Sequence, residues 1–343
     1  MAGYRARLKD IAEATGFSAN TVSLALRGSP RLPKETRERI LEAAERLNYS
    51  PNHIARSLVH STTRTIGLVL TDIMNPTLTL AARTIERELS RAGYAMMFAA
   101  SDSSVENERL AIELFLSYQV DGMLIYPADH REFGHIEAAD RAGTPVLLLV
   151  ELPGSSLDTV AIDDRIGAYK AFRLLCQQGH RRIAMLDGGR GLGNFDKMHG
   201  AQKAIGEAGL SDEALIVFEP EGHAPVHGFA AMRRVMASEP RPTALFASTD
   251  SLAVGALHWC RENGLAVPRD FAVIGYDNTE ISQYGALPLT TVNYAADEIS
   301  KIGVHRILQR IERPETCGAP CVTLIEPELV VRASSGSEPG PAR

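Results

Sequence analysis

The sequence has no apolar run long enough to cross a membrane. Its longest apolar stretches, such as VLLLV at 146–150 and AVGALHW at 253–259, fall far short of the roughly twenty residues that a membrane-spanning helix needs. The basic residues Arg5, Arg7 and Lys9 near the N-terminus are not followed by an apolar segment, so a secretory signal is not expected. We therefore expect a protein that stays in the cytoplasm and does not bind membranes.

Cysteine is scarce, and the motifs of common enzyme chemistry are missing. Cys176, Cys260, Cys317 and Cys321 stand in unrelated contexts, and the Cys317 to Cys321 spacing lacks the histidine or second cysteine pair that a zinc site needs. We interpret all four as reduced and mostly structural, and we expect neither a metal nor a cofactor. The sequence has no nucleophile–base motif and no phosphate-binding loop, so an enzyme is not expected.

The net charge is divided unevenly along the chain. The 343 residues are 45% apolar and carry a net charge of -6, which is compatible with a large core and two or three domains. Residues 1–64 hold 11 Lys or Arg and 6 Asp or Glu, a net charge of +5, which leaves -11 for the remainder. The basic part is suited to a phosphate backbone, and the acidic part would be repelled by it.

The first 50 residues show the pattern of a helix-turn-helix. Leu8, Ile11 and Ala12 fall on one helical face, Gly16 interrupts the helix where a tight turn is needed, and Ser18 is placed to cap a second helix. The sequence therefore predicts a small DNA-binding head.

The second helix should run to about Leu26, and a third from about Lys34 to Leu47. Helical spacing puts Val22, Ala25 and Leu26 inside, which leaves other positions of the second helix facing outward. The outward positions are Ala19, Asn20, Ser23 and Leu24, and the apolar stripe of the third helix is Ile40, Leu41, Ala44 and Leu47.

The segment NHIARSLV at 52–59 has helical spacing but is too short to form a stable helix alone. It could become ordered when bound DNA braces it. A polar linker, residues 60–64, follows it.

The rest of the chain alternates short apolar runs with amphipathic helices such as 80–94, 107–118, 198–209 and 251–263. This alternation predicts βαβ units and parallel sheets covered on both faces. The expected strands form two series, which predicts two doubly wound lobes. They are 65–72, 94–100, 122–128 and 145–151 in the first lobe, then 181–188, 214–220, 243–248 and 271–278 in the second.

Together, the segments KDIAEATGFSANTVSLAL, ETRERILEAAERLNYSPNHIARSL and the two strand series resemble the lactose-repressor (LacI) family of bacterial transcription regulators, from Leu8 to about Ala333. The resemblance implies an α/β fold, with a helix-turn-helix head joined to a core like that of periplasmic sugar-binding proteins. The expected domains are a head at 1–50, a hinge helix and linker at 51–64, a core for effector binding and dimerisation at 65–333, and a disordered tail at 334–343. In the family the chain crosses between lobes three times, here expected at AIDD after the fourth strand, at GYDNTEISQYGALPLTTV and at VTLIEPELVVR.

Several side chains of the second helix can contact DNA. The hydroxyls of Ser18, Thr21 and Ser23 suit phosphates, Asn20 can bond an adenine edge, and Ala19 and Leu24 can touch a thymine methyl. The less favoured alternative for Asn20 is a solvated surface residue. The resemblance adds the hinge residues Asn52, Ala55 and Leu58, because the family inserts a leucine, here Leu58, into the minor groove. The alternative for Leu58 is a docking contact between domains.

Pocket positions are carried over from the family. They are Asp72, Thr77, Leu78, Asp163, Lys197, Thr249 and Asp277, with Asn75 and Val150 beside them. Asp277 follows a strand and could accept bonds from ligand hydroxyls, or it could cap the next segment. Thr77 and Leu78 stand where relatives often carry aromatics, and Lys197 replaces a usual arginine. We expect a polar, sugar-like ligand, and Lys197 makes an anionic group plausible.

Three other residues have open roles. Trp259 is expected in the core, and His180 is expected to be structural. His223 either lines the mouth of the pocket or is an ordinary surface residue. The pair Asp163 and Asp164 is more typical of a helix cap than of a catalytic pair.

These features predict a dimeric regulator, a repressor, whose affinity for a pseudo-palindromic operator depends on a small effector in the interlobe cleft. A dimer is expected because the tail lacks apolar heptads, and the helix at about 78–91 should contribute to its interface. The alternative is a solute-binding sensor module that does not regulate genes directly.

Overall fold

The computed structural model describes residues 6–26, 29, 31–49 and 62–336. The described residues divide into two compact units, one lying within Met1–Thr63 and the other within Arg64–Arg343. The expected hinge helix, with Asn52, Ala55 and Leu58, lies outside the described residues.

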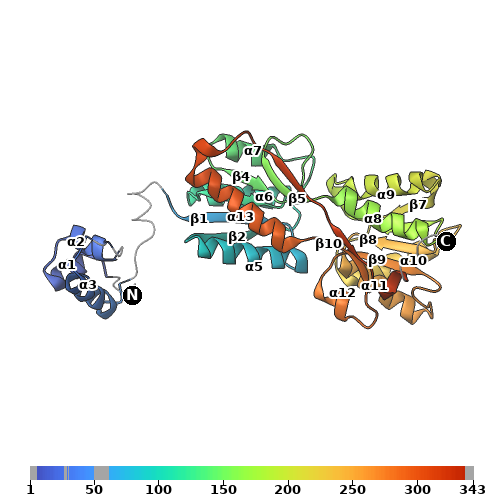
Figure 1. Cartoon of the computed structure of the whole chain (residues 1–343), viewed down its shortest axis with the longest axis horizontal. Helices are drawn as coiled ribbons and strands as arrows, with labels where there is room; N and C mark the ends of the chain where they lie inside the picture. The colour runs from blue at the N-terminus through green and yellow to red at the C-terminus, as the bar shows by residue number, and fades with distance from the viewer. Residues whose placement is uncertain (1–5, 27–28, 30, 50–61, 337–343) are drawn as a thin grey trace. The chain divides into compact units, whose positions relative to one another are not determined.

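The first unit is a three-helix head (Figure 1). Gly16 ends the first helix with a φ of 74°, a left-handed conformation that glycine adopts without strain. Ser18 caps the second helix by accepting a hydrogen bond from the Thr21 amide at 3.1 Å. Leu41, predicted to lie in the apolar stripe, is instead 40% exposed, because Ala43 and Ala44 take the inner face of the third helix. The helices are α1 (Leu8–Thr15), α2 (Ala19–Leu26) and α3 (Lys34–Arg46), and their buried core is Ile11, Val22, Ala25, Ile40, Ala43 and Ala44.

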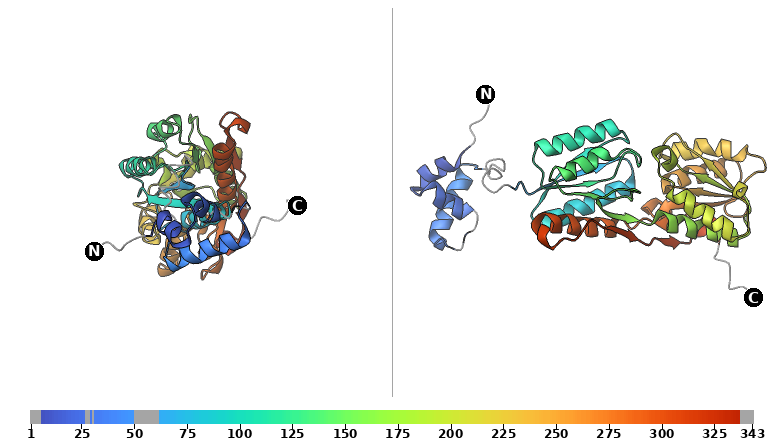
Figure 2. Two further views of the ribbon diagram at one scale, coloured as in Figure 1. Left: turned by 90° about the vertical axis from the view of Figure 1, so that its left-hand side faces the viewer. Right: turned by 90° about the horizontal axis from the view of Figure 1, so that it is seen from above.

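The second unit contains the two predicted doubly wound lobes. The first lobe is a parallel six-stranded sheet in the order β11-β5-β4-β3-β1-β2. Helices α5 and α13 pack together on one face, and α6 and α7 cover the other (Figure 2). Its strands are β1 (Thr65–Leu70), β2 (Ala95–Ala100), β3 (Gly122–Ile125), β4 (Val146–Leu148), β5 (Asp158–Ile162) and β11 (Val322–Ile325), and its helices are α5 (Pro76–Arg91), α6 (Val105–Ser117), α7 (Gly134–Arg141) and α13 (Ala296–Glu312).

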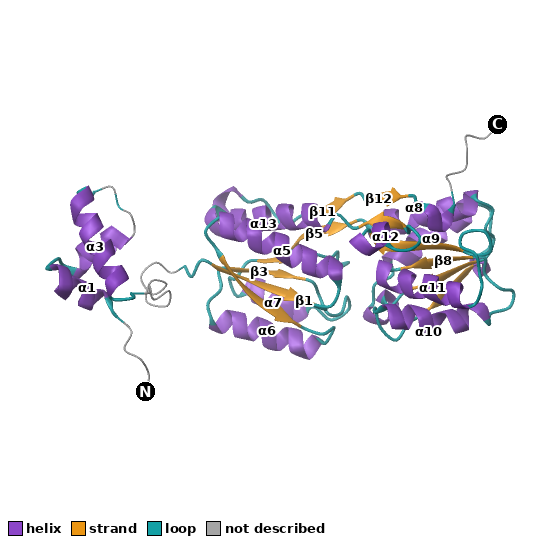
Figure 3. Cartoon of the chain, turned by 90° about the horizontal axis from the view of Figure 1, so that it is seen from below, coloured by secondary structure: helices purple, strands orange, loops and turns teal. Residues whose placement is uncertain are grey.

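The second lobe repeats this plan in the order β12-β10-β9-β8-β6-β7, with only β12 antiparallel to its neighbour among the described strands. Helices α8 and α9 pack on one face, and α10 and α11 on the other (Figure 3). A Cβ at Gly255 would overlap the Pro225 carbonyl oxygen, so glycine permits the close approach of α10 and α11. The strands are β6 (Ile183–Leu186), β7 (Leu215–Phe218), β8 (Ala244–Ala247), β9 (Ala272–Asp277), β10 (Thr290–Asn293) and β12 (Glu328–Val330), and the helices are α8 (Asp164–Gln177), α9 (Asp196–Glu207), α10 (Pro225–Met236), α11 (Asp250–Glu262) and α12 (Glu280–Tyr284).

The chain passes between the lobes after β5, after β10 and after β11 (Figure 1). The first crossing therefore follows the fifth strand and not the fourth. The expected segment AIDD overlaps the end of β5, a buried strand whose neighbours β4 and β11 lie far from each other in the sequence.

The expected disordered tail begins too early at 334. Ser334 and Ser335 are buried in the second lobe. The Ser334 hydroxyl donates to the Val273 carbonyl at 2.6 Å and accepts from the Thr290 amide at 2.8 Å. Small hydroxyl side chains can satisfy backbone groups at the edge of a sheet, and composition alone does not reveal that role.

Trp259 packs beside the apolar cluster of the second lobe, as predicted for a core residue. In the described residues, no helix combines the length and the apolar character required to cross a bilayer.

Candidate functional site

The candidate DNA-facing residues lie at the start of α2. Ala19 and Asn20 are exposed, whereas Thr21, Ser23 and Leu24 are half-buried. The hydroxyls of Ser18 and Thr21 are 2.9 Å apart and share a hydrogen bond. Both hydroxyls therefore stabilise the start of the helix, and Asn20 is the side chain of this group that extends into solvent with both amide donor and acceptor atoms.

A second candidate site lies between the lobes, where strands of both sheets end. The loop after β3 meets the loop after β6: the His130 amide donates to the Leu192 carbonyl at 2.8 Å, and Arg131 Nη2 donates to the Gly191 carbonyl at 2.7 Å. Ligands of doubly wound sheets bind at the carboxyl ends of strands. The two hydrogen bonds join the lobes at the carboxyl ends of their strands, where such a ligand would bind.

Lys197, at the start of α9, is the centre of a charged cluster. Its Nζ lies 2.9 Å from Asp164 Oδ2 and 4.5 Å from the centre of the Tyr276 ring. The other carboxylate oxygen of Asp164 accepts from the Tyr276 hydroxyl at 2.6 Å. Burial opposes the charge on Lys197, but the nearby carboxylates of Asp164, Asp187 and Asp277 outweigh it and raise the pKa of Lys197. Lys197 is therefore a cation already paired by the protein.

This pairing changes the interpretation of Lys197. The sequence made an anionic ligand group plausible because of this residue, but in the structure Asp164 neutralises it. The buried Asp187 adds a further carboxyl, and burial raises its pKa. An added anion would therefore find no unpaired positive charge at Lys197.

Asp277 ends β9 and is half-buried in the cleft. Burial, followed by the charge of Asp250, raises its pKa well above the usual range, while Lys197 acts in the opposite direction. The hydroxyl of Thr77, in the first lobe, lies close enough to Asp277 to lower the pKa of this acid. Among the described residues, the Thr77 hydroxyl makes no hydrogen bond of ordinary geometry. Asp277 and Thr77 thus face each other across the cleft with polar atoms to offer a ligand.

Two neutral histidines complete the cleft. His130 in the first lobe and His223 in the second both have a lowered pKa because they are buried, in spite of nearby carboxylates. For His223 these carboxylates are Asp187, in its own lobe, and Asp72, in the first lobe. His223 therefore lies at the cleft and not on an ordinary surface. Its buried Nδ1 has no hydrogen-bond partner in the described chain. A ligand donor or acceptor there would satisfy it.

Several carried-over positions have structural roles. Asp163 caps α8 by accepting from the Ile166 amide at 2.9 Å, and Thr249 caps α11 by accepting from the Leu252 amide at 3.2 Å. Leu78 is buried in the core of the first lobe. Asn75 caps α5, and Asp72 accepts from the Met74 amide at 2.7 Å. Helix caps cluster here because helices begin where strands end.

Sequence reasoning missed other residues of the cleft. Asp187 and Tyr126 directly follow strands, a signal that could have been used, whereas Tyr294 follows β10 at the second crossing. Burial raises the pKa of the Tyr126 and Tyr294 hydroxyls, which lie close to each other. The structure also places Asp164 and His130 near Lys197.

Asp250 is a buried acid that fastens the second lobe. It accepts from the Thr291 hydroxyl at 2.6 Å and from the Thr279 amide at 2.7 Å. Burial raises its pKa from 3.8 to about 6, against the effect of these hydrogen bonds. Its role is to hold the segment that follows Asp277.

A raised pKa means that the folded protein binds the Asp250 proton more tightly than the unfolded chain does. The contribution is full below the unfolded pKa of 3.8 and is lost as the pH rises through about 6. It amounts to about 3 kcal/mol. We expect the free energy of unfolding of Asp250→Asn to lack this decrease with rising pH. Urea unfolding of the variant and the wild type at several pH values measures the difference. Equal pH dependence of the free energy of unfolding in the two proteins would contradict the raised pKa.

Comparisons with known proteins agree with this arrangement. The family model for bacterial regulatory proteins of the lacI family matches residues 7–52, and that for the periplasmic binding protein-like domain matches residues 172–335. The HTH-type transcriptional repressor PurR of Mannheimia succiniciproducens is 30% identical over 332 residues, covering 96% of this chain and 98% of the relative.

The chain belongs to the LacI family. Its fold matches the crystal structure of the Lac repressor dimer bound to operator and the anti-inducer ONPF, with a TM-score of 0.87, 25% identity, and coverage of 97% of this chain and 100% of that one. It also matches a complex of the transcriptional regulator CelR with cellobiose, with a TM-score of 0.70, 28% identity, and coverage of 96% and 100%. This LacI-family chain is a transcriptional repressor with a ligand-binding core, and not an enzyme.

Proposed function

We propose that the protein is a homodimeric cytoplasmic repressor whose hold on a pseudo-palindromic operator is set by an uncharged, polyhydroxylated effector in the cleft. The single observation that carries the effector class is the neutralisation of Lys197 by Asp164 at 2.9 Å. The proposed organisation is a head at 1–50, a hinge at 51–64, and a core that begins at 65.

On the DNA side, the exposed Asn20 of α2 reads a base edge. Ala19 and Leu24 contact thymine methyl groups, and Ser18, Thr21 and Ser23 position the helix near phosphates. The hinge residues Asn52, Ala55 and Leu58 bind the minor groove at the centre of the operator, with Leu58 as an apolar wedge.

On the effector side, the proposed contacts are the carried-over positions together with His130, His223 and Asp187. Carboxyl, hydroxyl and imidazole groups supply acceptors and donors for ligand hydroxyls. Lys197 keeps ammonium hydrogens beyond the one used by Asp164, which can donate to a hydroxyl oxygen. Thr77 offers no aromatic face, and Leu78 is packed in the core, so neither position supplies the stacking surface that relatives often carry there. The carried-over effector positions are Asp72, Thr77, Leu78, Asp163, Lys197, Thr249 and Asp277.

The dimer interface is proposed at exposed apolar side chains on both lobes. Large exposed hydrophobic groups gather on α5, β2, α6 and α12, and patches of this kind mark protein contacts. The Lac repressor to which the chain is similar was solved as a dimer on operator. The proposed residues are Leu80, Phe98, Leu110, Leu114, Tyr118, Ile281 and Tyr284.

Control follows from cleft closure. The contacts of His130 with Leu192 and of Arg131 with Gly191 join loops of opposite lobes, so opening the cleft would break them. A ligand that favours closure shifts the lobes across the dimer interface and changes the pairing of the two hinges.

The effector class is tested by thermal unfolding of the full chain with a panel of small molecules. Uncharged sugars are expected to raise the melting temperature, because a ligand at 100 times its Kd stabilises by about 2.7 kcal/mol. Sugar phosphates and sugar acids of the same skeleton should give no shift. A larger shift with the anionic member of a matched pair would overturn the assignment. The same effector must also change operator affinity, which fluorescence anisotropy measures.

A further inference from the structure

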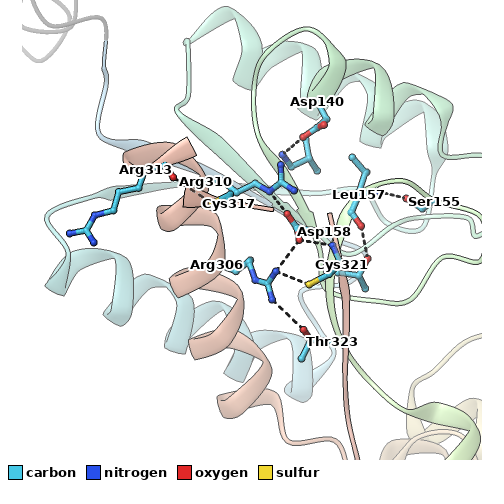
Figure 4. A network of polar contacts seen from close by, with 12 residues as sticks. Asp140, Ser155, Leu157, Asp158, Arg306, Arg310, Arg313, Cys317, Cys321 and Thr323 are labelled. Atoms are coloured by element: carbon cyan, nitrogen blue, oxygen red, sulfur yellow. Dashed lines mark hydrogen bonds and ion pairs between the residues drawn. The ribbon is translucent and has the colours of Figure 1, made fainter. Parts of the chain in front are cut away.

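A second polar cluster lies in the first lobe, in the loop that joins α13 to β11 (Figure 4). Asp158, at the start of β5, is buried and contacts both Arg306 and Arg310 of α13. Cys317 and Cys321 bracket the short loop of Gly318, Ala319 and Pro320. None of these residues belongs to the cleft or to the head.

Cys321 holds this cluster together through both its backbone and its sulfur. Its amide donates to Asp158 Oδ1 at 3.0 Å, and its carbonyl accepts from the Thr159 amide at 3.0 Å, where β11 begins to pair with β5. Arg306 Nη1 lies 2.7 Å from its Sγ, and this hydrogen bond is the first cause of a raised pKa of Arg306. The Cys321 sulfur is therefore exposed and in contact with a guanidinium, two features of the surroundings of reactive cysteines.

Cys317 acts on the same arginine. Its sulfur also contributes to the raised pKa of Arg306, so both sulfurs lie near one guanidinium. At present its thiol donates to the Arg313 carbonyl at 3.6 Å. Cys321 is exposed and Cys317 is half-buried, and the position of a Cβ at Gly318 is open space. An oxidant can reach the exposed Cys321 thiol, and only three residues separate Cys317 from Cys321 in the loop.

The other two cysteines differ from this pair. Cys260 is buried, and burial raises its pKa to about 11. Burial also raises the pKa of Cys176. Both stay thiols at neutral pH, which makes them unreactive internal references.

We propose that Cys321 and Cys317 form a thiol–disulfide redox site that responds to hydroperoxides. The Cys321 sulfur attacks one oxygen of the hydroperoxide, the O–O bond breaks, and the alcohol or water leaves after taking up a proton. The Cys317 sulfur then attacks the resulting sulfenic acid, the S–S bond forms, and water leaves. The two thiols lose two electrons, and the hydroperoxide gains them.

Oxidation has a structural consequence. The disulfide withdraws the Cys321 sulfur from Arg306 and pulls on the loop whose backbone anchors Asp158 and starts β11. Strand β11 leads directly to the third crossing between the lobes. The redox site thus acts on a segment that links the lobes and requires no effector.

To test the proposal, the reduced full chain is treated with hydrogen peroxide. The intact mass, the number of free thiols and the melting temperature are then measured. We expect a loss of two hydrogen atoms, disappearance of two thiols, a melting temperature lower by about 2 to 4 °C, and full reversal by dithiothreitol. The Cys317→Ser variant should instead gain one oxygen and react with a sulfenic-acid probe. The Cys176→Ser variant should behave as the wild type does.

Two outcomes would overturn the proposal: the same oxidation product in Cys317→Ser and the wild type, or a disulfide that links two chains. These readouts do not involve DNA or effector, so they stand or fall apart from the proposed function.

Discussion

Asp277→Ala is expected to lower effector affinity at least about 100-fold while operator binding without effector stays intact. The physical reason is the loss of a polar group that faces Thr77 across the cleft and whose removal leaves ligand hydroxyls without a partner in a buried place. The expected loss corresponds to about 2.7 kcal/mol. Calorimetric titration of the effector and anisotropy with labelled operator measure the two parts.

Asp277→Asn is the matched control for this variant. Burial is the first cause that raises the pKa of Asp277, and an amide has nearly the same shape as the carboxyl group and keeps atoms that donate and accept hydrogen bonds. Asparagine also tolerates the φ of 113° at this position better than alanine does. We expect Asp277→Asn to lose much less affinity. If both variants keep the wild-type response, Asp277 is not an effector ligand.

Asn20→Ala is expected to weaken operator binding by about 1 to 3 kcal/mol, or roughly five- to 150-fold, through one base pair. The exposed amide on α2 is the group that can make two directional bonds to a base edge. The measurement is a thermodynamic cycle: each protein is titrated with the best operator and with operators that carry single base changes.

Changing the base pair that Asn20 reads should lower the operator affinity of the wild-type protein but not that of Asn20→Ala. Ser18→Ala serves as the control, because it removes the α2 cap and should cost about 1 kcal/mol of stability without changing the preference for any base. A variant that discriminates among all operators as the wild type does would remove Asn20 from base readout.

The cleft shows how charge pairing restricts a ligand. Asp164 binds Tyr276 with one oxygen and Lys197 with the other, so this pair has little net charge to present. The buried carboxyl groups around it then favour a ligand that brings hydroxyl groups and no negative charge.

The sequence by itself predicted the head and the two lobes. The turn at Gly16, the cap at Ser18 and the alternation of buried strands with amphipathic helices are local patterns, and a pattern within ten or twenty residues is visible without knowing what packs against it. The same reasoning misplaced Leu41 and the start of the tail. Whether such residues are buried or exposed depends on packing partners, which can be distant in the sequence, as Thr290 is from Ser334.

Only the tertiary structure decided the chemistry of the cleft. Lys197 and Asp164 are 33 positions apart in the chain, and Thr77 meets Asp277 from the opposite lobe. Whether a lysine is free to bind an anion depends on which carboxylate lies beside it, and a carboxyl takes its proton affinity from burial. Both are properties of three-dimensional proximity, so the sequence could name the residues of the site but not the charge that a ligand meets there.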